Sequence, residues 1–212
     1  MRARVRGGER EAFGELYELH AQAVYNHALR LTGNWSAAEE VMSETFLAAW
    51  RGRRDVEGDG GSLRPWLFGI ATNKARNAER GVRRRLAFLA RRSEVDVVGD
   101  FAEELAGRVD DARRLAEVRR VLGRLRRHER EVLALCVWGG LDYAQAAEAL
   151  GVPVGTVRSR LSRARKRLRE FVEREERSAH ISPKGFMEPR SRRGEVESEA
   201  AFVALPLQEE TR

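Results

Sequence analysis

The densest group of functional side chains in this sequence is a run of cations between positions 158 and 169, with no acidic residue before Glu170. The run consists of Arg158, Arg160, Arg163, Arg165, Lys166, Arg167 and Arg169. Guanidinium groups bind phosphate oxygens and pair bidentately with O6 and N7 of guanine, so the run is typical of a nucleic-acid interface. A surface helix whose charges are merely solvated would have the same composition. The neighbouring elements have to decide between these two interpretations.

A helix-turn-helix pattern surrounds the cationic run. Residues 142–150 predict a short Ala-rich helix, Gly151 suits the left-handed conformation that ends a helix, and residues 152–155 form the turn. Thr156 is expected to cap the following helix, 156–171, by accepting from amides of its first turn. That helix has one apolar face, formed by Val157, Leu161, Ala164 and Leu168. A short helix, a tight turn and a basic helix together predict a recognition helix for the major groove of DNA.

A second segment, 64–85, combines aromatic, amide and cationic side chains. Four polar residues at i, i+3, i+4 and i+7 share one helical face: Asn73, Arg76, Asn77 and Arg80. Trp66 and Phe68 precede them, and Arg83, Arg84 and Arg85 extend the charge. Such a surface holds phosphate while unstacked bases stack on aromatic rings, at about 1–3 kcal/mol per base. Taken alone, either aromatic residue is better explained as part of a hydrophobic core.

Composition supports nucleic acid as the partner and argues against other classes. Lys and Arg outnumber Asp and Glu by 40 to 33, which gives a net charge of +7 and a pI near 10.4. The four histidines and the single Cys136 show no metal-ligand spacing, and no phosphate loop or nucleophile elbow is present. We therefore expect that the protein binds no metal and no cofactor and is not an enzyme. The lone cysteine and the lack of a long apolar segment predict a cytoplasmic protein.

Apolar residues recur at helical spacing throughout two blocks of the chain, which predicts an all-α fold of two small helical domains. Helix breaks are expected at Gly33 and Gly58–Gly61, a capping box at Ser36 and Glu39, and a helix start at Pro65. The predicted division is 1–92 for the first domain, 93–111 for a flexible acidic linker, 112–177 for the second domain and 178–212 for a flexible extension.

The strings 129–135, 140–143 and 149–165, above all GVPVGTVRSRLSRAR, closely resemble region four of the sigma-70 family. The resemblance implies contacts with the minus-thirty-five promoter element and with the polymerase flap. The residues that it assigns to this promoter element are Thr156, Arg158, Ser159, Arg160, Ser162, Arg163 and Lys166.

The first block resembles sigma region two in two places. Residues 36–50 are similar to its polymerase-binding helix, which implies docking on the polymerase clamp helices through Glu39, Glu40, Glu44, Phe46 and Trp50. Residues 64–80 are similar to its promoter-melting helix, which implies minus-ten contacts from Trp66, Asn73, Arg76, Asn77, Arg80, Arg83 and Arg84. Without the resemblance, the glutamates would be read as a solvated acidic face.

The sequence as a whole predicts a small sigma factor of the extracytoplasmic-function (ECF) type. Such a factor binds core RNA polymerase, duplex and single-stranded promoter DNA, and in some cases an anti-sigma factor. The alternative is a helix-turn-helix repressor or activator that acts without replacing sigma. A repressor or activator of that kind would not need the acidic helix or the aromatic-basic helix, so these two helices favour the sigma factor.

Overall fold

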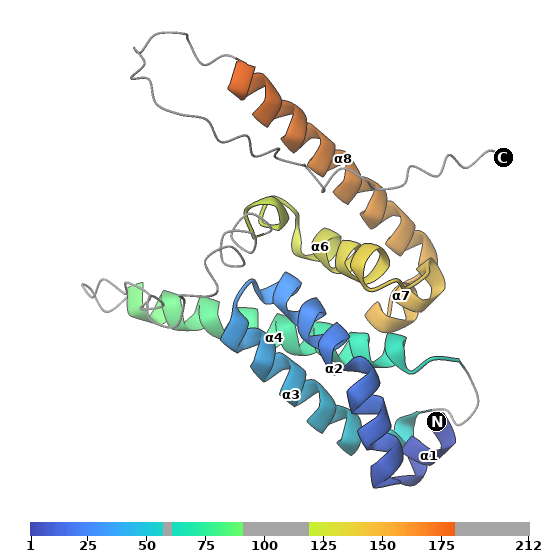
Figure 1. The fold of residues 1–212 in the computed structure, drawn as a ribbon. Helices are drawn as coiled ribbons and strands as arrows, with labels where there is room; N and C mark the ends of the chain where they lie inside the picture. Colours follow the sequence, from blue (N-terminus) through green and yellow to red (C-terminus); the bar gives the residue numbers. More distant parts are fainter. Residues whose placement is uncertain (57–60, 91–118, 181–212) are drawn as a thin grey trace, which may run out of the picture.

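The computed structural model describes residues 1–56, 61–90 and 119–180, and in these residues the regular structure is helical throughout (Figure 1). The all-α prediction is confirmed. The predicted linker, 93–111, and most of the predicted C-terminal extension lie outside the described residues. The elements are α1 (Arg2–Gly7), α2 (Arg10–Thr32), α3 (Trp35–Arg51), η1 (Arg53–Asp55), α4 (Arg64–Ala90), α6 (Arg127–Leu133), the π-helical turn η2 (Ala134–Trp138), α7 (Tyr143–Leu150) and α8 (Val154–His180).

In the first block, residues 1–90, α2, α3 and α4 pack side by side. Gly33 joins α2 to α3 with a φ of 63°, as the predicted break requires. The predicted capping box at Ser36 is wrong. The cap is Asn34, whose side chain accepts from the Ala37 amide at 2.8 Å, because the helix already begins at Trp35.

In the second block, residues 119–180, α6, α7 and α8 pack together. Gly151 ends α7 with a φ of 63°, which confirms its predicted role. The prediction for Thr156 as a cap is wrong, because α8 begins at Val154. The Pro153 carbonyl accepts from the Thr156 amide at 2.9 Å, so Thr156 lies within the first turn.

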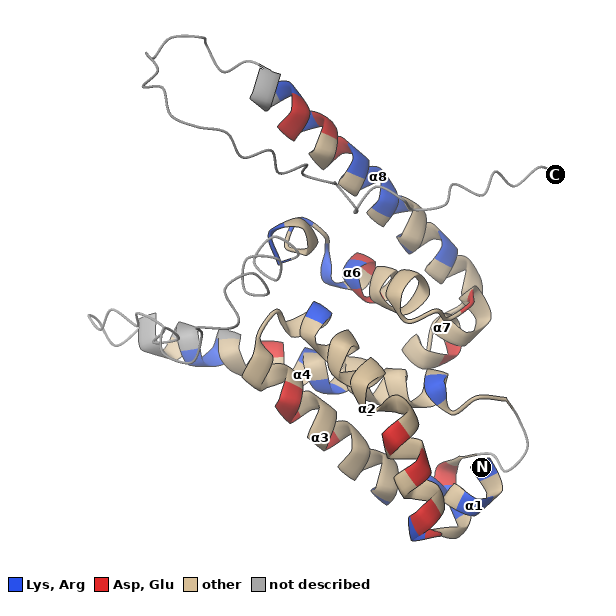
Figure 2. Cartoon of the chain, in the orientation of Figure 1, with Lys and Arg blue, Asp and Glu red and all other residues tan. Residues whose placement is uncertain are grey.

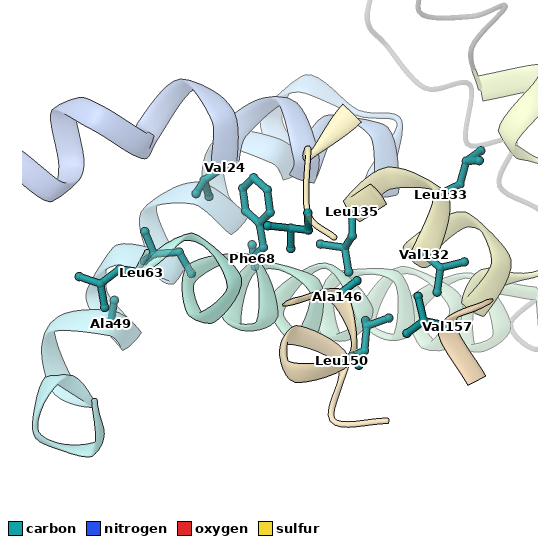
Figure 3. Close-up of a cluster of buried hydrophobic side chains, with 14 of the residues drawn as sticks. Val24, Ala49, Leu63, Phe68, Val132, Leu133, Leu135, Ala146, Leu150 and Val157 are labelled. Carbon is teal, nitrogen blue, oxygen red and sulfur yellow. The ribbon is translucent and has the colours of Figure 1, made fainter. Parts of the chain in front are cut away.

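The two blocks share one hydrophobic core rather than lying apart. Figure 3 shows Val24 and Phe68 of the first block in one buried cluster with Leu135, Ala146 and Leu150 of the second. The contact between α4 and α7 is the main junction, and η2 packs on α2 beside it. The position of α8 is therefore tied to that of α4.

A buried histidine lies at the centre of the first block. The Nε2 atom of His27 is 2.9 Å from the Thr72 hydroxyl, and that hydroxyl donates to the Phe68 carbonyl at 2.7 Å. Because the hydroxyl has one proton, Nε2–H of His27 must be the donor to Thr72. The ring also stacks on Phe68, with centroids 4.9 Å apart. Burial, reinforced by the nearby Arg30 charge, lowers the pKa of His27 to about 3.

We expect this neutral histidine to make stability depend on pH. In the unfolded chain His27 binds a proton below about pH 6.5, while in the folded chain it stays neutral down to about pH 3. The free energy of unfolding should therefore fall as pH decreases from 6.5, by at most about 1.4 kcal/mol per pH unit from this residue. Urea unfolding of the wild type and His27→Gln between pH 7.5 and 4.5 measures the difference. Parallel curves for the two proteins would contradict the prediction; His20 is present in both and does not affect the comparison.

Candidate nucleic-acid interface

The outer face of α8 presents most of the residues predicted to read duplex DNA. Arg158, Ser162, Arg163 and Lys166 are exposed, while Thr156, Ser159 and Arg160 are half-buried. The Ser159 hydroxyl donates to the Thr156 carbonyl at 3.1 Å and accepts from Arg163 at 3.3 Å. Figure 2 shows the basic positions along α8, beside the less charged α7. The face is a linear array of cations and hydroxyls that begins in the first turn of the helix.

Packing beneath α8 holds this array in place. Val157, Leu161 and Ala164 are at most 1% exposed and lie in the shared core. Glu129 of α6, fully buried, pairs with Arg167 at 3.4 Å. The Arg158 guanidinium lies 6.0 Å from the centre of the Tyr143 ring on α7. The structure therefore has the helix-turn-helix geometry in which a rigid second helix enters a groove.

The polar face of α4 exists as predicted, but the second block covers part of it. Asn73 and Asn77 are exposed, and Arg80 donates to the Asn77 side chain at 2.6 Å. Arg76 is only 23% exposed, because its Nε and Nη2 atoms each donate to a carboxylate oxygen of Glu131 at 2.7 Å. Hydrogen bonding to Glu131 raises the pKa of Arg76. Arg84 is exposed, whereas the side chain of Arg83 lies outside the described part of the chain.

The two aromatic residues that precede this face have different environments. Trp66 is half-buried against the shared core. Phe68 is 1% exposed, stacked on His27 and covered by the Arg64 guanidinium at 5.3 Å. Phe68 is therefore a core residue, and Trp66 is the aromatic ring of the pair that remains partly open to solvent.

The α3 helix presents an exposed stripe that includes the predicted glutamates. Its members are Ser36, Glu39, Glu40, Ser43, Glu44 and Leu47. Glu44 pairs with Lys74 of α4 at 2.7 Å. The two aromatic residues predicted for the same contact lie inward: Phe46 is 6% exposed, and Trp50 packs edge-on against Phe13 at 5.1 Å. They support the stripe from beneath.

Sequence reasoning missed two features of these surfaces. Leu47 is 55% exposed at the end of the α3 stripe. It also missed the ion pairs between blocks, Arg76 with Glu131 and Arg130 with Glu79. The exposure of Leu47 was readable from its position three residues after Glu44. The ion pairs had no local signal in the sequence, because Arg76 and Glu131 are 55 residues apart and Glu79 and Arg130 are 51 residues apart.

Comparison with known proteins decides between sigma factor and repressor. Residues 16–85 match the model of sigma-70 region 2, and residues 115–168 match that of sigma-70, region 4. The RNA polymerase sigma factor NccH of Alcaligenes xylosoxydans xylosoxydans is 32% identical over 171 residues, covering 78% of this chain and 89% of that protein. The chain belongs to the sigma-70 family. This sigma factor directs transcription initiation at promoters together with RNA polymerase, and the repressor alternative is not supported.

Other relatives place the sigma factor in the ECF group. The ECF sigma factor SigK of Mycobacterium tuberculosis H37Rv is 29% identical over 174 residues, covering 80% of this chain and 90% of that protein. The fold is similar to that of CnrH, which was solved in complex with the cytosolic domain of CnrY. The TM-score is 0.63 and the sequence identity 28%, and the match covers 81% of this chain and 94% of CnrH. The fold is also similar to that of RpoE of Bartonella quintana, which was solved with the anti-sigma factor NepR. The TM-score is 0.59 and the sequence identity 27%, and the match covers 77% of this chain and 98% of RpoE. A search of the described residues for a membrane-spanning helix, by length and hydropathy, finds none.

Proposed function

We propose that this sigma factor divides promoter recognition between two exposed helical faces, α8 for the minus-thirty-five element and α4 for the minus-ten element. The outer face of α8 carries the proposal, since its cations and hydroxyls are exposed on a helix held by a buried core. The sigma factor acts by binding and has no catalytic role of its own. Its site of action is the cytoplasm, where the polymerase is.

At the minus-thirty-five element, base edges are contacted by side chains from the first turns of α8. These are Arg158, Ser159, Ser162 and Arg163. Lys166, one turn further along, contacts phosphate and fixes the register. Thr156 and Arg160 lie at the edges of this face and contact the DNA backbone. Each bidentate arginine contact with a base is typically worth about 1–3 kcal/mol of discrimination.

At the minus-ten element, the α4 face holds the separated non-template strand. Asn73, Asn77 and Arg80 form its exposed part, Arg76 joins them when it is released from Glu131, and Arg83 and Arg84 extend the basic track. Trp66 offers a ring on which an unstacked base can stack. Because polymerase holds both blocks at a fixed spacing, two modest contacts combine into tight promoter binding.

The domain division that we propose places region two in residues 1–92 and region four in residues 112–177, joined by the acidic stretch 93–111. By analogy with RpoE and NepR, an anti-sigma factor is a further candidate partner of this chain. Residues 178–212 have no assigned role in this proposal.

The α3 stripe docks on the clamp helices of core polymerase, and reversing its charge tests this contact. We choose Glu39→Lys and Glu40→Lys, because Glu44 is already engaged by Lys74. Placing cations against a surface that binds anions removes attraction and adds repulsion. We expect the dissociation constant for core polymerase to rise at least about tenfold, equivalent to 1.4 kcal/mol.

Fluorescence anisotropy of labelled sigma factor titrated with core polymerase measures this affinity. Glu173→Lys, an equal charge change at an exposed position of α8, is the matched control and should bind normally. If all three variants bind core polymerase as the wild type does, the α3 stripe is not the docking surface. Circular dichroism of each variant confirms that the helices are intact.

A further inference from the structure

The short helix α1 lies outside residues 16–85, which match sigma-70 region 2, yet it is firmly held in the first block. Val5 of α1 is completely buried, in the same hydrophobic cluster as Val56 and Leu63. Val56 and Leu63 begin and end the connection between η1 and α4. The functions proposed above give α1 no role, so its contacts with this connection call for one.

The first residue of α1 is bonded to the segment that leads into α4. Nε of Arg2 donates to the Gly61 carbonyl at 2.8 Å, and its Nη2 donates to the Ser62 carbonyl at 3.2 Å. One side chain thus bridges two successive carbonyls that lie 59 and 60 residues further along the chain. A guanidinium group suits this bridge, because its donors stand in a rigid, planar fork.

The bridged segment continues directly into the first turn of α4. The Ser62 hydroxyl accepts from the Arg64 amide at 3.1 Å, which satisfies an amide that the helix itself leaves without a partner. Leu63 is 3% exposed, and its carbonyl accepts from the Leu67 amide at 3.0 Å. Trp66 lies in this first turn. The position that Arg2 gives to Ser62 is therefore passed on to the start of α4.

The other end of α1 is fixed on η1, beside which it packs (Figure 1). Gly8 ends α1 with a φ of 84°, and a Cβ atom there would lie 3.1 Å from Nε of Arg53. Arg53 in turn lies over the Trp50 ring at 4.4 Å and donates to the Trp50 carbonyl at 2.7 Å. The same helix thus contacts both ends of the connection between η1 and α4.

The composition of this connection explains why it needs such support. Glycine occupies positions 58, 60 and 61, and glycine loses more conformational freedom on folding than any other residue. At Gly61 a Cβ atom would meet nothing within 4 Å, so the backbone there is not fixed by packing. The hydrogen bonds from Arg2 supply the restraint that packing does not.

We propose that Arg2 is a positioning residue for promoter opening: from α1 it fixes the start of α4, so that Trp66 meets an unstacked minus-ten base in the right orientation. This inference rests on the proposed role of the α4 face. Arg2 acts through the backbone of Gly61 and Ser62 and needs no contact with DNA. Its loss should therefore slow strand opening and leave polymerase docking by the α3 stripe unchanged.

Four single substitutions test the proposal in the full chain. Arg2→Gln removes the charged fork, and Arg6→Gln is the matched control, an equal charge change at an exposed position of the same helix. Arg2→Lys keeps the charge without the planar fork, so it separates bridging from attraction to phosphate. Trp66→Leu removes the ring but keeps an apolar side chain. Permanganate reactivity of unpaired thymines measures the rate of opening by holoenzyme, on the promoter that run-off transcription locates.

We expect Arg2→Gln and Arg2→Lys each to slow opening roughly fivefold, because the hydrogen bonds that orient the backbone are lost. Trp66→Leu should slow opening roughly tenfold through the loss of a base stack. The Arg2→Gln, Trp66→Leu double variant should be no slower than Trp66→Leu alone, because a residue that acts through another adds nothing once the other is gone. Arg6→Gln should open the promoter as the wild type does, and every variant should bind core polymerase with unchanged affinity.

Three results would overturn the positioning role. The first is normal opening with Arg2→Gln. The second is full activity with Arg2→Lys, which would mean that Arg2 acts by its charge on phosphate. The third is a double variant roughly fiftyfold slower than the wild type, since independent effects multiply and would make Arg2 a general structural residue. Circular dichroism confirms that each variant keeps its helices.

Failure of this inference is distinguishable from failure of the proposed function. If Trp66→Leu slows opening and Arg2→Gln does not, only the positioning role of Arg2 is wrong. If Trp66→Leu opens the promoter as the wild type does, the minus-ten assignment of Trp66 is wrong, and the inference is wrong with it.

Discussion

Replacing Arg158 and Arg163 together by alanine should lower promoter-specific transcription by roughly a hundredfold. Both side chains are exposed in the first turns of α8, where a recognition helix meets base edges. Losing each contact typically costs about 1–3 kcal/mol, and about 2.8 kcal/mol corresponds to a hundredfold change. Single-round run-off transcription with saturating core polymerase measures the loss.

Two controls separate recognition from structure and from general charge. Arg169→Ala removes an exposed cation from the same helix beyond the predicted base contacts, and we expect at most a few-fold effect from one phosphate contact. Core polymerase affinity should be unchanged in the double variant, because α3 is intact. Transcription that survives the double substitution but fails with Arg169→Ala would show that the register of α8 on DNA is different.

Replacing Phe68 by alanine should remove about 3–5 kcal/mol of stability, a large share of the 5–15 kcal/mol typical of a domain. Phe68 is 1% exposed, and its ring stacks on His27. A Cβ atom on Gly139 would lie 2.9 Å from it, which shows how closely the second block covers the ring. The cavity left by its removal therefore adjoins both blocks, and the loss includes part of the junction.

Urea unfolding followed by circular dichroism measures this loss. Phe88→Ala is the matched control, since Phe88 lies on the same helix but is 56% exposed, and it should change stability by less than about 1 kcal/mol. Equal losses in the two variants would mean that the region around Phe68 is not a packed core. A separate early transition confined to Phe68→Ala would locate the damage at the junction between blocks.

The helices and the α8 face were predictable because both depend on local periodicity. The apolar face of α8 is a pattern within one helix and consists of Val157, Leu161, Ala164 and Leu168. When this face packs into the core, the cations between these positions are exposed. Capping was predicted less well: Asn34 and Ser36 are both good caps two residues apart, and the start of α3 at Trp35 decided between them. The cap predicted at Thr156 was wrong for the same reason, since α8 begins at Val154, before the first residue of its apolar face.

The contacts between blocks were not predictable from the sequence. Glu131 has the local pattern of a charged helical residue, yet it is 2% exposed because Arg76, 55 residues earlier, meets it across the junction. Gly69 gives no sign in the sequence that α7 approaches its backbone. Such features depend on how separate helices meet, which local spacing does not encode.

Run-off transcription with bacterial core polymerase, on DNA upstream of the gene for this chain, tests the sigma function most directly. The reaction is run with core alone, with core and wild type, and with core and the Arg158→Ala, Arg163→Ala double variant. We predict a discrete transcript with the wild type, none with core alone, and a strong loss with the double variant. Tight DNA binding by the protein alone, with no transcript from any mixture, would contradict the account.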